Sequence, residues 1–218
     1  MNRVAKYKVK VFAEGNTECN YISGLKKISN INFTFEDVDM KGGGYSNFLK
    51  KVNTISPLNC IVCFVIIDLD NAESDKKNLD ELIKVCNDRS KKTKIPYILI
   101  GNNYDFEYFC CCHFLDYHNG DTSLYIKRQL HYNNVDEFKA DSNMYNVLNN
   151  AKSKSSFELA LEKTKVQFNA NNTYFKYGCV PFKKGLDIKF KNTKLIINKE
   201  ALNTKHSNFM DFFTIIKI

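Results

Sequence analysis

The stretch that decides the fold is CIVCFVIIDLD, residues 60–70. Its opening run, CIVCFVII, is almost continuously apolar and has the length of a strand, and it stops abruptly at Asp68-Leu69-Asp70. A short strand with apolar residues at nearly every position is typical of the centre of a parallel sheet, because both of its faces are covered. We therefore predict a central parallel strand over residues 60–67.

Strand and helix patterns alternate on both sides of this run. Further strands are predicted over residues 6–13, 32–39 and 96–101. Helix-like segments follow the strands, over residues 20–28, 45–55, 75–90 and 105–118. This alternation predicts an α/β fold with a mostly parallel sheet flanked by helices.

The pattern changes after about residue 120. Helix-like segments at 123–132 and 155–168 are followed by β-like pieces at 174–182, 186–191, 194–199 and 212–218. We therefore expect one domain over residues 1–118 and a helical and small β extension over residues 119–218, packed on it.

The composition favours a basic protein that acts away from membranes. A net charge of +8, from 32 Lys and Arg against 24 Asp and Glu, favours a polyanionic partner such as nucleic acid, although it also serves solubility. No stretch approaches the roughly 18 to 20 uncharged apolar residues of a membrane helix. The N-terminus has neither the apolar run nor the cleavage site of a signal peptide. We expect a cytoplasmic protein with no membrane partner.

The eight cysteines predict reduced, buried side chains. Cys110, Cys111 and Cys112 are consecutive in an apolar stretch, and Cys60 and Cys63 lie within the central strand. Although the latter two have CxxC spacing, a zinc site needs a second pair at similar spacing, and the sequence contains none.

Acidic side chains come directly after three of the predicted strands. Glu14 and Glu18 follow the first strand, Asp68 and Asp70 follow the apolar strand, and Glu107 follows the strand at 96–101. In an open parallel sheet, ligand sites lie outside the carboxyl ends of the strands. We therefore expect these acids to converge on one site.

The spacing of these acids suits a divalent cation. Side chains two residues apart on an extended strand point the same way, so Asp68 and Asp70 would repel each other without a cation between them. Mg²⁺ uses one or two carboxylates together with water and substrate phosphates. Glu14, at a neighbouring strand end, would act as general base or acid or complete a second metal site.

Each signal also has a purely structural interpretation. Aspartate is favoured in turns, and glutamate near a helix N-terminus complements the helix dipole. The metal interpretation is favoured by the conjunction of both signals in the first turns after predicted parallel strands.

Three segments resemble the RloB-like family of the Toprim superfamily, which is related to the OLD-type Toprim nucleases. EGNTECNYISGL (14–25) is similar to the family's EGxxTE signature, and FVIIDLDNAE (64–73) to its strand ending in DxD. IGNNYDFEYFCCCHF (100–114) is similar to its SNPCFExWLLLHF segment, and the sequence departs from that pattern at Tyr104 and Asp105. The matching positions in this third segment are Asn103, Phe106, Glu107, His113 and Phe114.

The resemblance covers about residues 8–115 and implies a Toprim fold, with a catalytic domain over residues 1–118. It implies Glu14, Asp68 and Asp70 as catalytic residues, with Mg²⁺ or Mn²⁺ held by these three and by Glu18. Asn103, Glu107 and His113 would be accessory residues. His113 has a second interpretation, because a histidine with apolar neighbours is more often packed and hydrogen-bonded than a proton shuttle.

The sequence thus predicts a metal-dependent nuclease that cleaves RNA, such as tRNA, or DNA. The resemblance implies the toxic effector of an anti-phage defence system, working beside a separately encoded ABC-type ATPase, because no Walker A string occurs in the chain. Assembly into a homo-oligomer stays open. The alternatives are a non-cleaving module that binds nucleic acid or the ATPase, and an enzyme that processes nucleotides.

Overall fold

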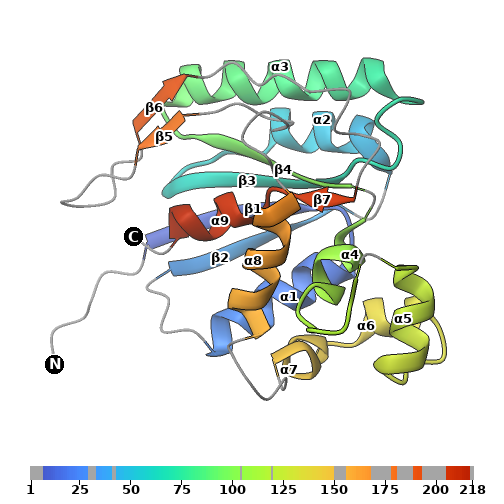
Figure 1. The fold of residues 1–218 in the computed structure, drawn as a ribbon. Coiled ribbons are helices and arrows are strands. Elements are labelled where there is room, and N and C mark those ends of the chain that lie inside the picture. Colours follow the sequence, from blue (N-terminus) through green and yellow to red (C-terminus); the bar gives the residue numbers. More distant parts are fainter. Residues whose placement is uncertain are drawn as a thin grey trace, which may run out of the picture.

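The computed structural model describes residues 7–28, 33–40, 43–103, 105–118, 120–149, 156–167, 178–180, 189–192 and 205–216. The fold is α/β, with a mostly parallel five-stranded sheet between helices, as predicted (Figure 1). Within the described ranges, no helix is long and apolar enough to cross a membrane.

The main sheet has the strand order β2-β1-β3-β4-β7. Its strands are β1 (Tyr7–Ala13), β2 (Phe33–Asp39), β3 (Cys60–Asp68), β4 (Tyr97–Asn103) and β7 (His206–Ser207). The first four run parallel to one another, and the short β7 pairs with the end of β4 in the antiparallel direction. The predicted apolar run is therefore the central strand of the sheet.

Strand β3 is buried on both faces because its side chains alternate between two hydrophobic cores. Val62, Phe64 and Ile66 enter one core, and Cys63, Val65 and Ile67 enter the other. This division follows from the two-residue period of a strand, and it explains why the sequence of β3 shows no polar face.

Helices cover both faces of the sheet (Figure 1). One core is closed by α2 (Gly44–Thr54) and α3 (Lys76–Thr93), which pack against each other. The other is closed by α1 (Asn16–Ile28), α4 (Phe106–Cys111) and α9 (Phe209–Ile216). Its centre is aromatic: the Tyr21 ring has edge contacts with Phe106, Tyr145 and Phe209, with centroids 5.4, 4.9 and 5.7 Å away.

Four further helices extend the second core beside α1 and α4: α5 (Thr122–Gln129), α6 (Val135–Ala140), α7 (Met144–Asn149) and α8 (Ser156–Gln167). Asp121 and Asn134 cap α5 and α6 by accepting the backbone N–H of Leu124 and Glu137, each at 2.8 Å. Residues 119–218 thus contribute to the same core as residues 1–118, while the predicted boundary near residue 118 stays a prediction.

The prediction for the chain's end is wrong over residues 212–216, where the sequence predicts a β-like piece and the structure has α9. Three phenylalanines of α9, Phe209, Phe212 and Phe213, are buried under the sheet, and Asn208 accepts the N–H of Asp211 at 2.9 Å at the helix start. Tertiary packing and a helix start override the local β pattern here. Helix α4 is also shorter than the segment predicted over 105–118, since the chain turns after Cys111.

Elsewhere in the C-terminal part, two short strands, β5 (Gly178–Val180) and β6 (Lys189–Asn192), form a separate antiparallel pair. Strand β5 lies within the β-like piece predicted at 174–182, and β6 overlaps the piece predicted at 186–191 and extends one residue beyond it. The piece predicted at 194–199 lies outside the described residues.

Helix α1 requires a glycine at position 24. A Cβ there would lie 2.2 Å from Cβ and 2.7 Å from Cγ of Tyr145 on α7. Replacing an exposed helix glycine with alanine gains about 1 kcal/mol of helix propensity, whereas forcing atoms into a packed core costs about 1–3 kcal/mol. Because the clash involves atoms close to the Tyr145 backbone, which cannot move away easily, the packing cost exceeds the gain in helix propensity.

We therefore expect Gly24→Ala to lower the free energy of unfolding by about 1–2 kcal/mol, measured by urea denaturation. The neighbouring exposed Ser23, changed to alanine, is the control and should leave stability unchanged or slightly higher. A Gly24→Ala protein more stable than the wild type would contradict this account of the α1–α7 contact.

Candidate active site

The carboxyl ends of β1, β3 and β4 lie at one edge of the sheet because these strands run parallel. Glu14 follows the last residue of β1, Asp68 is the last residue of β3, and Asn103 is the last residue of β4. The register pairs Ala13 with Ile66 and Asp68 with Asn102, so the three strand ends are level with each other.

A cleft of about 230 Å³ opens at this edge. The described residues that line it come from the ends of β1 and β3, from the start of α2 and from the turn before α3: Glu14, Gly44, Tyr45, Asp68, Asp70, Asn71, Ser74 and Asp75. The structure therefore brings the three acids predicted to be catalytic into one cleft, although Glu14 precedes Asp68 and Asp70 by more than fifty residues in sequence.

Asp68 has a carboxylate oxygen, Oδ1, that is buried at the cleft without a hydrogen-bond partner among the described residues. Burial, followed by the charges of Glu18, Glu107 and Glu14, raises the pKa of Asp68 well above its ordinary value. An isolated carboxylate in such surroundings is unfavourable unless a cation or a proton neutralises it.

Glu14 and Asp70 share the cleft in different environments. Burial raises the pKa of Glu14, a backbone hydrogen bond from Asp68 lowers it, and the charge of Asp70 raises it. Asp70 is exposed, and its Oδ1 accepts a hydrogen bond from Asn71 Nδ2 at 2.9 Å. The backbone of the DxD segment is fixed from α2, because the Tyr45 hydroxyl donates to the Asp68 carbonyl oxygen at 2.7 Å.

Glu18 and Glu107 form a second acidic pair, buried on α1 and α4, and neither is among the described residues that line the cleft. The Thr17 hydroxyl donates to Glu107 Oε1 at 2.7 Å. Burial, then the charges of Glu107 and Glu14, raises the pKa of Glu18 to about 7. The structure therefore places Glu18 behind the cleft, next to the acids it was predicted to join.

Lys139 brings a positive charge to these acids, and no sequence motif marks this residue. Its Nζ lies 3.5 Å from Glu107 Oε2, and the side chain is 42% exposed. The pKa of Lys139 is raised, because Glu107 and Asp68 outweigh the lowering effect of burial. The C-terminal end of α6 is held on α1 by Asn20, whose Nδ2 donates to the Lys139 carbonyl at 3.0 Å.

The donor set fits a cation that is only partly held by protein. Among the residues that the structure describes, no group of three His, Cys, Asp or Glu side chains is arranged to hold a metal ion. Mg²⁺ usually takes one or two carboxylates and completes its shell with water and substrate phosphate. The buried, unpaired Oδ1 of Asp68 with Glu14 and Asp70 in the same cleft is a donor set of that kind.

The predicted accessory residues Asn103 and His113 are buried away from the cleft lining. Asn103 pairs with His206 of β7. His113 lies between α1 and α8, with Nε2 2.9 Å from the Tyr21 hydroxyl and Nδ1 3.1 Å from Ser156 Oγ.

One consistent direction of hydrogen bonding runs along this chain of groups. The Ser156 hydroxyl donates to Asn149 Oδ1 at 3.2 Å, so it accepts from His113 Nδ1–H, and Nε2 accepts from Tyr21. Burial lowers the pKa of His113 to about 3, which keeps the ring neutral. This geometry is that of a packed core histidine.

Seven cysteines are free thiols, and all of them except Cys19 are buried: Cys19, Cys60, Cys63, Cys86, Cys110, Cys111 and Cys112. Burial raises the pKa of the Cys63 thiol to about 12. These side chains are therefore thiols within the core rather than reactive or bridging groups.

Comparison with known proteins gives no relative: no family model, no curated protein and no solved structure matches the chain.

Removing the charge of Asp68 should stabilise the metal-free protein. The unfolded state loses the proton of an aspartate near pH ~4, whereas the folded state keeps it to higher pH because the folded-state pKa of Asp68 is raised. As the pH rises above about 4, this carboxyl therefore lowers the free energy of unfolding more and more. We expect Asp68→Asn to raise the free energy of unfolding by about 1–3 kcal/mol at pH 8, and by less at pH 5. Urea denaturation in EDTA at both values measures the difference.

Asp88→Asn is the matched control, because Asp88 is an exposed carboxylate on α3 and should change stability by less than about 0.5 kcal/mol. Added Mg²⁺ should stabilise the wild type and not Asp68→Asn. Loss of stability in Asp68→Asn at pH 8 would show that the carboxylate is compensated in the fold.

Proposed function

We propose that this chain is a Mg²⁺-dependent nuclease of the Toprim type, in the RloB-like family, which hydrolyses phosphodiester bonds in RNA or DNA. The observation that supports this proposal is the cleft at the carboxyl edge of the sheet, in which Glu14, Asp68 and Asp70 meet and one buried carboxylate oxygen of Asp68 has no partner. The motif resemblance supplies the reaction, and the geometry supplies a donor set suited to the ion.

Asp68, Asp70 and Glu14 would hold the Mg²⁺ or Mn²⁺. A bound divalent ion neutralises charge on a phosphate and activates water as a nucleophile. Residues of the chain would position the metal ligands and exchange protons with the reacting groups. The bond from the Tyr45 hydroxyl keeps the Asp68 backbone fixed while substrate enters. Glu14 has a pKa raised toward neutrality, which favours proton exchange with the attacking water or the leaving oxygen.

Lys139, which pairs with Glu107 beside the acids of the cleft, would be a cation that meets substrate phosphate. It is half exposed, so it is accessible, and it is oriented by Glu107, which Thr17 holds in turn. A lysine ammonium beside a developing negative charge lowers the barrier to the reaction. Glu107 and Glu18 would thus act through Lys139 and through the electrostatics of the cleft.

The biological setting follows from the same resemblance. We propose a cytoplasmic effector of anti-phage defence whose toxicity is controlled by a separate ABC-type ATPase. The net charge of +8 suits a nucleic-acid substrate.

The direct test combines metal binding with cleavage. We expect the wild type to bind Mn²⁺ by calorimetry and to cut tRNA, single-stranded or duplex substrates when Mg²⁺ or Mn²⁺ is present. Glu14→Gln and Asp68→Asn should reduce the cleavage rate at least about a hundredfold, because each removes a group that acts in the transition state. Asp88→Asn should match the wild type.

A wild-type protein that neither binds Mn²⁺ nor cuts any of these substrates would contradict the proposal. Mn²⁺ binding without cleavage, unchanged when the ATPase is added, would favour the non-cleaving module.

Lys139 gives a separate prediction. Lys139→Ala should lower the cleavage rate about tenfold or more while leaving Mn²⁺ affinity within about threefold, because the lysine acts on phosphate rather than on the ion. The control is Lys127→Ala, which removes the same charge from an exposed position on α5. Equal rates for the two variants would remove Lys139 from the site.

A further inference from the structure

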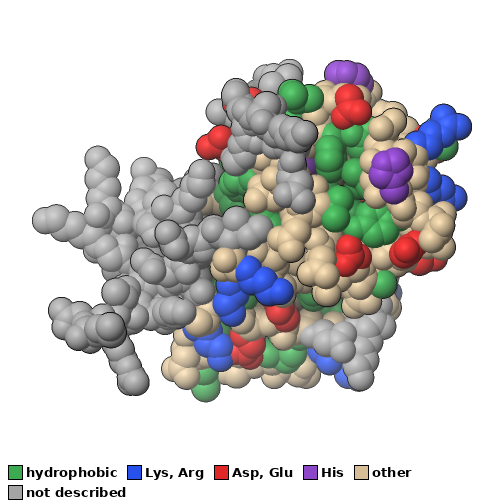
Figure 2. Space-filling model, turned by 90° about the horizontal axis from the view of Figure 1, so that it is seen from below, with side chains coloured by type: hydrophobic (Ala, Val, Ile, Leu, Met, Phe, Trp, Pro, Cys, Tyr) green, Lys and Arg blue, Asp and Glu red, His purple; other side chains and the backbone are tan. Residues whose placement is uncertain are grey.

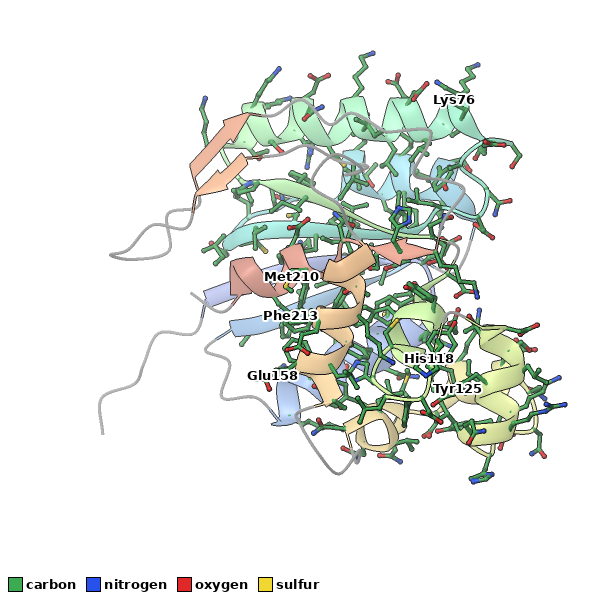
Figure 3. The ribbon with its side chains drawn as sticks, in the orientation of Figure 1. Lys76, His118, Tyr125, Glu158, Met210 and Phe213 are labelled. Carbon is green, nitrogen blue, oxygen red and sulfur yellow. The ribbon has the colours of Figure 1, made fainter. Side chains whose placement is uncertain are left out.

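A second pocket, of about 300 Å³, lies between α5 and the chain segment that precedes it. The described residues that line it include Tyr117, His118, Leu124, Tyr125, Arg128 and Gln129. His118 and Tyr125 are labelled in Figure 3, where they lie side by side between α4 and α5. Seen from below, hydrophobic side chains gather at the end of the molecule formed by α5–α7, with histidine and acidic side chains around them (Figure 2).

The pocket has a rigid aromatic wall. Tyr117 is buried and Tyr125 is half-buried, and their rings meet edge to face with centroids 5.0 Å apart. The Tyr125 hydroxyl donates to Asp116 Oδ1 at 2.6 Å, and the Tyr117 hydroxyl donates to the Gly120 carbonyl at 3.0 Å. Both rings are therefore fixed before any ligand arrives, so little conformational entropy is lost when a flat group stacks on them.

Three polar side chains around this wall, those of His118, Arg128 and Gln129, make no hydrogen bond or ion pair with the described residues. All three are exposed. By contrast, Asp121 is engaged as the cap of α5 and Asp116 by Tyr125. Cationic and amide donors thus remain available beside an aromatic surface.

The segment that carries the pocket is held in place by two lysines. Lys163 Nζ on α8 donates to the carbonyl oxygens of Leu115 and Tyr117 at 3.1 and 2.8 Å. Lys205 Nζ donates to the Gly120 carbonyl at 2.5 Å and lies 6.0 Å from the Tyr108 ring centroid. The two lysines therefore fix the shape of the pocket by bonding backbone carbonyl groups, and they are not available to bind a ligand.

We propose that this pocket binds one nucleotide of a single-stranded nucleic acid. The base would lie against Tyr125 and the exposed Leu124, Gln129 would bond its edge, and Arg128 with His118 would hold the adjoining phosphate. Aromatic stacking is tolerant of base identity, arginine pairs well with phosphate, and an amide both donates to and accepts from base edges.

The pocket connects to the acidic cleft through α4. Tyr108 contacts Tyr117 of the pocket with centroids 6.1 Å apart, and the adjacent Glu107 bonds Thr17 and Lys139 near the cleft. A strand held at the pocket would therefore approach the cleft from the α5 side. This assignment rests on the proposed function for its substrate class and adds single-strandedness to it.

The test measures binding without cleavage. In EDTA, the wild-type protein should bind a fluorescent single-stranded hexanucleotide, and the affinity is followed by anisotropy. Arg128→Ala should weaken this binding about fivefold or more. The neighbouring Lys127→Ala removes the same charge from the same helix outside the pocket, and should weaken it less than twofold.

Two substitutions of Tyr125 separate stacking from the hydroxyl group. Tyr125→Phe keeps the stacking face and loses the bond to Asp116, so it should weaken binding by less than about threefold, whereas Tyr125→Leu should weaken it about tenfold, the size of one stacking contact. Tyr125→Leu also disturbs packing, because Tyr125 is half-buried. Arg128 is exposed, so a loss of binding in Arg128→Ala does not reflect a loss of folding. Titration of AMP, followed by NMR, distinguishes a free nucleotide from a strand: shifts at residues 117–129 with AMP tighter than the hexanucleotide would overturn the strand assignment.

Equal losses in Arg128→Ala and Lys127→Ala, or no binding of either probe, would overturn the pocket assignment even if Mg²⁺-dependent cleavage is found. Binding that depends on Arg128 in a protein that never cleaves would leave the pocket in place and contradict the nuclease proposal instead.

Discussion

The structure depends on one electrostatic constraint: a carboxylate is held at the end of the central strand of the sheet. β3 is apolar on both faces, so the sheet around it excludes water, and Asp68 ends it with one oxygen shielded from solvent and without a partner. The neighbouring acids add repulsion instead of relief. Such a group stays ionised only when a cation approaches it, which is why the cleft at this edge has the character of a metal site.

Much of this arrangement could be predicted from the sequence because it depends on local patterns. An apolar run of strand length, ended by an acid, indicates a central parallel strand, and parallel strands place their carboxyl ends at one edge. That reasoning was enough to bring Glu14, Asp68 and Asp70 together. The prediction fails for residues 212–216, where a β-like pattern becomes α9 because Phe209, Phe212 and Phe213 are buried beneath the sheet.

The remainder of the site depends on contacts between distant segments, which leave no mark in a single sequence. Lys139 belongs to a short helix with no motif, and only the folding of α6 against α1 brings it to Glu107. Nothing in the sequence around Glu18 indicates that the side chain is buried behind the cleft. The aromatic pocket beside α5 is formed by tyrosines, and the sequence alone does not distinguish tyrosines that line a pocket from tyrosines that pack in the core.

The central claim is that Asp68 is a metal ligand, and the most direct measurement is the anomalous density of a crystal soaked with Mn²⁺. The account predicts one peak in the cleft, about 2 Å from Asp68 Oδ1 and adjacent to Glu14 or Asp70. Full occupancy at the buried Glu18–Glu107 pair with an empty cleft, or no peak at either place, would contradict it.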